Sequence, residues 1–100
     1  MKLPNWHQRP EEFDPESHRD GVLDSSSFLR AADQFISLAN KRNKKIEATE
    51  LQFVTLYASA RYAAHVGKNV FNVSDHEEFV QHMVVQYTDM LRSNMADPTV

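Results

Sequence analysis

Arg61 is the residue whose setting is most suggestive of chemistry, because it interrupts the long apolar run Leu51–Val66. A guanidinium held among apolar side chains could bind the carboxylate or phosphate of a small ligand. It could equally form a structural ion pair or hydrogen bond with Asp33 or Asn40 of a preceding helix and so orient the two helices. We favour the structural interpretation, since Arg61 has no Gly-rich phosphate loop and no second cation beside it. Small-ligand binding around Arg61 remains an alternative.

Histidines and carboxylates offer little for metal binding or catalysis. Only Glu78 and His82 have the four-residue spacing that places two metal ligands on one face of a helix, and two ligands do not make a site. Asp75, Glu77 and Glu78 lie where a helix is expected to begin, and acids are favoured there by the helix dipole. The sequence therefore predicts no metal, no cofactor and no catalytic residues, and we expect a protein that is not an enzyme.

A short basic stretch is the feature that could contact nucleic acid. Four of the eleven basic residues lie within five positions: Lys41, Arg42, Lys44 and Lys45. They could bind phosphates, or they could simply be solvated at the end of a helix. The next helix has Glu47 and Glu50 at its start and apolar residues beyond. The acids would repel DNA phosphates and the apolar residues could not face a groove, so this helix does not suit DNA recognition. With a net charge of −3 as well, nucleic-acid binding through this loop is an alternative that we do not favour.

Composition limits the class of protein. The chain has 100 residues, enough for one small domain, and it contains no cysteine, so its stability must come from packing. Only two glycines are present, Gly21 and Gly67, which argues against a turn-rich β fold. The first 24 residues lack the apolar core of a secretory signal, and no run is long enough to span a bilayer. We expect a cytoplasmic protein with no membrane association.

Hydrophobic periodicity predicts an all-α fold of three antiparallel helices at about 26–41, 49–66 and 74–94. The connections of about seven residues suit antiparallel neighbours in a bundle. Residues 1–24 form a proline-rich, acidic leader that we expect to be disordered, and residues 25–97 form the helical domain.

The expected helix ends depend on a few residues. Ser25, Ser26 and Ser27 are candidates for the N-cap of the first helix, and Ser74 opens a capping-box pattern before the third. Gly67 is placed to end the second helix in a left-handed conformation, as glycine often does.

The leader contains two aromatic residues, Trp6 and Phe13, among its prolines. Trp6 could rest on the helical domain, or it could belong to a short motif that becomes ordered on a partner. An isolated aromatic residue in such a segment favours the first interpretation.

The predicted middle helix is apolar on two opposite sides. One side carries Leu51, Val54, Ala58 and Tyr62. The other side, with its flank, forms what we refer to as the association face: Phe53, Leu56, Tyr57, Ala60 and Ala64. A surface helix needs only one apolar stripe, so this one must be covered from two directions. We therefore expect a protein partner, and we favour a homodimer over a monomer.

Two runs in this sequence, FLRAADQFISLAN (28–40) and LYASARYAA (56–64), resemble a family of small bacterial proteins known as domain of unknown function 3144. The expected third helix also resembles that family at several positions: Phe79, Tyr87, Met90, Leu91 and Asn94. The resemblance covers about residues 28–94 and leaves the leader outside.

The resemblance implies a cytoplasmic bacterial helical domain, and it assigns no activity, cofactor or partner. It marks Asp33, Asn40 and Arg61 as the polar positions inside the similar runs. From the residues and the resemblance together, we expect a non-enzymatic module for protein interaction or self-association.

Overall fold

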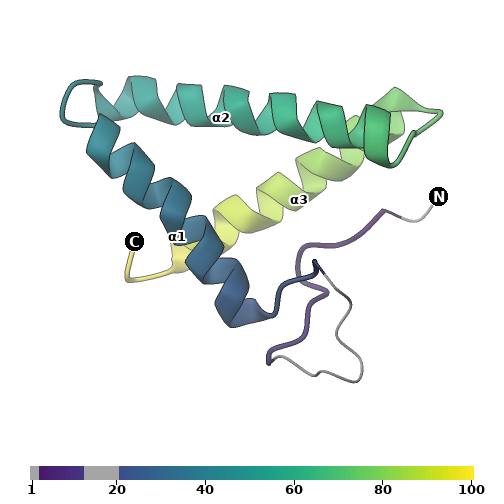
Figure 1. Cartoon of the computed structure of the whole chain (residues 1–100), viewed down its shortest axis with the longest axis horizontal. Coiled ribbons are helices and arrows are strands. Elements are labelled where there is room, and N and C mark those ends of the chain that lie inside the picture. Colours follow the sequence, from purple (N-terminus) through teal and green to yellow (C-terminus); the bar gives the residue numbers. More distant parts are fainter. Residues whose placement is uncertain (1–2, 13–20) are drawn as a thin grey trace. The chain divides into compact units, whose positions relative to one another are not determined.

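The computed structural model describes residues 3–12 and 21–100 (Figure 1). In this part of the chain, the regular secondary structure is entirely helical. In chain order the helices are α1 (Ser25–Arg42), α2 (Ala48–His65), a short π-helical turn η1 (Val66–Val70) and α3 (His76–Ala96). The predicted all-α class and its three helices are confirmed. Their antiparallel arrangement remains a prediction.

The chain divides into two compact units, and the boundary lies near the end of α2. The first, which we refer to as the α1 unit, comprises His7–Tyr62. The second, the α3 unit, comprises Ala63–Val100 together with the N-terminal residues up to Trp6. None of the helices described has the length and apolar character needed to cross a membrane.

The N-cap residues of α1 and α3 are aspartates and not serines. Asp24 accepts a hydrogen bond from the Ser27 backbone N–H at 2.8 Å, and Asp75 accepts one from the Glu78 N–H at 3.2 Å. The serine caps expected at Ser25–Ser27 and at Ser74 are therefore wrong. A carboxylate satisfies the free N–H as well as a hydroxyl does, and its charge also interacts favourably with the helix dipole.

We expect a moderate loss of stability when the N-cap of α3 is removed. Asp75→Ala should lower the free energy of unfolding by about 1 kcal/mol, because the Glu78 N–H loses its partner. Urea denaturation followed by circular dichroism measures this loss. Asp75→Asn is the matched control, since an asparagine oxygen can accept the same hydrogen bond. Equal losses for the two variants would contradict a capping role.

Gly67 does not end α2 in the expected left-handed conformation. The helical path continues through η1, where the Phe71 N–H donates to the Val66 carbonyl at 3.0 Å, and the left-handed residue is Asn72, with φ of 51°. Gly67 is buried, and a Cβ atom there would lie 2.8 Å from the ring of Phe79. The position therefore requires glycine because of the close approach of an aromatic ring.

The α3 unit has a small buried core. Phe79 is 8 % exposed, and its ring lies 6.4 Å from that of Phe71, centroid to centroid, at an interplanar angle of 50°. This separation falls within the range of favourable aromatic pairs. Gln86, two turns further along α3, is 7 % exposed. Among the residues described, Phe79 is the one buried apolar side chain and Gln86 is the one buried polar side chain.

The α1 unit has no comparable core, since neither α1 nor the part of α2 within it contains a buried residue. Leader residues contact the start of α1. The Arg9 guanidinium lies over the Phe28 ring, 3.9 Å from its centroid, and donates to the Leu23 carbonyl at 3.2 Å. The Ser25 N–H donates to the Pro10 carbonyl at 2.9 Å. The leader was predicted to be disordered. Its residues 13–20, which include Phe13, lie outside the described residues, so the disorder of that part stays a prediction.

Candidate functional site

The polar residues singled out from the sequence all lie on the surface of the α1 unit. Asp33, Asn40 and Arg61 are exposed. Within the described part of this unit, the structure records no hydrogen bond or ion pair that joins any two of them. Arg61 therefore projects into solvent.

The four basic residues lie where α1 ends and the turn to α2 follows: Lys41, Arg42, Lys44 and Lys45. All four are exposed. Lys41 and Arg42 belong to the last turn of α1, where positive charge is favourable for the helix dipole. This position agrees with a solvated helix end and leaves the side chains accessible.

The Glu78 and His82 pair has no third potential metal ligand beside it in the described part of the chain. Across residues 3–12 and 21–100, no three His, Asp or Glu side chains gather as ligands would. His82 is half-buried, and its Nε2 lies 2.8 Å from the carbonyl oxygen of Pro4, at hydrogen-bonding distance. Its contact is therefore with the N-terminal segment.

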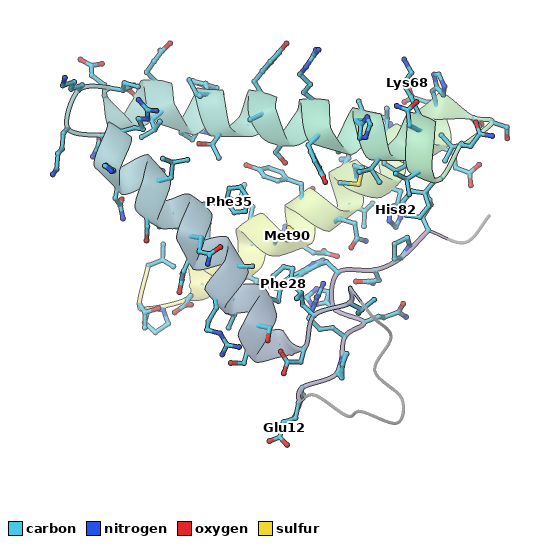
Figure 2. All side chains as sticks on the ribbon, viewed as in Figure 1. Glu12, Phe28, Phe35, Lys68, His82 and Met90 are labelled. Carbon is cyan, nitrogen blue, oxygen red and sulfur yellow. The ribbon has the colours of Figure 1, made fainter. Side chains whose placement is uncertain are left out.

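The association face predicted on α2 is exposed along its whole length. Phe53 is 61 % exposed and Tyr57 68 %, and Leu56, Ala60 and Ala64 are exposed as well. Large apolar side chains of α1, such as Ile36, are exposed too. Figure 2 shows Phe35 standing out from the α1 ribbon, and this side chain is 72 % exposed.

A second arrangement lies within the α3 unit, where Trp6 rests on the helical domain as the sequence favoured, against residues of α3 that the sequence did not identify. The segment Leu3–Trp6 runs beside α3, and the Trp6 N–H donates to Oε1 of the buried Gln86 at 2.8 Å. Pro4 contacts His82 one helical turn earlier. The structure thus places the half-buried Trp6 against α3. One feature of the sequence could have indicated this contact: Gln86 lies seven residues after Phe79 and so on the same helical face.

A small cavity of about 100 Å³ adjoins this segment. Leu3 forms one wall, and the others come from the residues before α3 and its first turn: Asn72, Val73, Ser74, Asp75, Glu78 and Phe79. Its lining combines apolar and polar side chains. A cavity of this size can accept one apolar side chain but not a typical metabolite.

A family model described as "Protein of unknown function (DUF3144)" matches residues 28–98, which include α2, α3 and all of α1 except its first three residues. The chain belongs to this family. No curated protein and no solved structure is significantly similar to it. For this DUF3144 protein, His82 and Gln86 lie within the matched region, whereas the segment that contacts them, Leu3–Trp6, lies before it.

Proposed function

We propose that this chain is a non-enzymatic helical module that associates with a second copy of itself through the α1 unit. The observation that carries the proposal is the absence of buried residues from α1 and α2, all of whose residues the structure describes. Large apolar side chains are exposed on both helices of the unit: Leu29, Phe35, Ile36, Leu38, Phe53, Val54, Leu56, Tyr57 and Tyr62.

The energetic argument follows from the size of these side chains. Burying one phenylalanine or leucine fully contributes about 1.5–3 kcal/mol, so covering only several of them would stabilise an assembly substantially. A second copy presents the same apolar surface, and a two-fold arrangement of two helix pairs yields a four-helix bundle. The small side chain of Ala60, on the association face, would let the helices approach closely.

Sedimentation velocity at several concentrations tests this proposal. We expect the mass of a dimer at high concentration and dissociation on dilution. Tyr57→Glu, which places a charge on the association face, should raise the dissociation constant about tenfold or more, equivalent to about 1.4 kcal/mol. Gln52→Glu is the matched control, because it adds the same charge to an exposed polar position of α2. A chain that stays monomeric at the highest concentration would contradict the proposal.

A second candidate function rests on the exposure of all four basic residues at the end of α1 and in the turn after it. Phosphate contacts there would give binding that weakens as salt increases. The test is an electrophoretic shift of DNA or RNA that disappears when Lys41, Arg42, Lys44 and Lys45 are replaced by glutamine. No shift with the unmodified chain rules this candidate out.

A further inference from the structure

We infer that α3 carries a recognition site for a short peptide segment, and that residues Leu3–Trp6 are its intramolecular occupant. The site, which we refer to as the α3 peptide site, consists of Phe79, His82 and Gln86. The inference is independent of self-association through the α1 unit, since every residue of the site and of its occupant lies in the α3 unit.

The site contacts two main-chain groups of the segment. His82 lies at hydrogen-bonding distance from the Pro4 carbonyl, and Gln86 accepts from the Trp6 N–H, each at 2.8 Å. Side chains four apart on a helix share a face and are separated by about 6 Å along the axis. One face of α3 therefore holds the segment at two main-chain groups.

The burial of Gln86 shows that the segment completes this face. A carboxamide that is 7 % exposed must have hydrogen-bond partners, because an unsatisfied buried polar group costs about 1–3 kcal/mol. The Trp6 N–H supplies a partner for Oε1. An apolar residue at position 86 would pack against the segment without needing such a partner. The glutamine therefore gives selectivity for a chain with a free N–H at that point.

Side chains of the segment supply the rest of the selectivity. Leu3 lines the cavity beside Phe79, and Trp6 is half-buried where the segment contacts Gln86. The occupant is therefore a short segment with leucine, a proline carbonyl and tryptophan at the spacing Leu-Pro-x-Trp. Main-chain hydrogen bonds fix its position, and the two apolar side chains set its sequence.

Two observations indicate that the occupant is a separable ligand. The family match begins at residue 28, so the α3 peptide site lies inside the family region and its occupant outside. The segment is followed by a leader that contains Pro10 and Pro15. A segment tethered in this way binds because of its high effective concentration, and the same contacts can form with an untethered copy of it. We expect a peptide of the sequence of residues 1–8 to bind in trans.

The fluorescence of Trp6, the one tryptophan of the chain, reports occupancy in the full-length protein. Gln86→Leu removes the acceptor and keeps the volume, so Trp6 emission should shift to longer wavelength and acrylamide should quench it more strongly. Gln81→Leu is the matched control, because Gln81 lies on α3, is exposed and bonds to Glu77. If Gln86→Leu loses helical circular dichroism, His82→Ala, at a half-buried position, replaces it. Emission and quenching equal to those of the unmodified chain would overturn the inference.

A labelled peptide MKLPNWHQ, added to the full chain, tests binding in trans by fluorescence anisotropy. Trp6→Ala weakens the intramolecular occupant, and this variant should bind the peptide saturably. The unmodified chain should bind the peptide at least about tenfold more weakly, because its own N-terminal segment competes for the site. Gln86→Leu in the Trp6→Ala background should abolish binding. Failure of the Trp6→Ala chain to bind, or equal binding with and without Gln86, would overturn the inference.

Discussion

Replacing Phe79 with alanine should lower the free energy of unfolding by about 3–5 kcal/mol. The ring is 8 % exposed and lies against Phe71 and Gly67, so its removal leaves a cavity where the α3 unit has its core. Small domains are stable by only about 5–15 kcal/mol in total, and the substitution should remove a large part of this. Guanidinium denaturation followed by circular dichroism measures the loss.

Val80→Ala is the matched control for this experiment. Val80 is the next residue of α3 but is 46 % exposed, so its truncation removes little buried surface. Alanine also has the higher helix propensity, which offsets part of any loss. We expect a change within about 0.5 kcal/mol, as for most surface substitutions. A Phe79→Ala loss no larger than that of Val80→Ala would show that Phe79 is not the centre of the core.

Hydrophobic periodicity was enough to predict the three helices of this protein, because each carries apolar residues at helical spacing over many residues. The ends were predicted within two residues, and the errors have a local cause. Asp24 and Asp75 compete with neighbouring serines for the same capping role, and the choice depends on backbone angles that the sequence does not state. Gly67 was correctly noticed and wrongly explained, because its requirement arises from Phe79, twelve residues away.

The α3 peptide site could not be predicted from local patterns. Gln86 and Trp6 are 80 residues apart in sequence, and Pro4 and His82 are 78 apart. Periodicity describes which side of a helix is apolar, but it does not say which distant segment covers that side. A glutamine within an apolar stripe was the one visible signal, and its partner is a main-chain N–H, which every residue except proline carries.

Gly67→Ala should lower the free energy of unfolding by about 1–3 kcal/mol, although alanine is the better helix former. The new Cβ would lie 2.8, 2.9 and 3.0 Å from three carbon atoms of the Phe79 ring, closer than van der Waals contact permits. The ring is buried and cannot move into solvent. Denaturation with guanidinium measures the loss under the conditions used for Phe79→Ala.

A double-mutant cycle separates this collision from any backbone effect of Gly67. Phe79→Leu removes the ring atoms that the new Cβ would approach, so Gly67→Ala should cost less in the Phe79→Leu background than in the unmodified chain. The difference is the coupling energy of the two positions, and residues in contact typically show about 0.5–3 kcal/mol. Equal costs in both backgrounds would mean that the glycine is needed for the geometry of the π-helical turn. Since Gly67 has no left-handed φ in this structure, we expect the coupling to account for most of the loss.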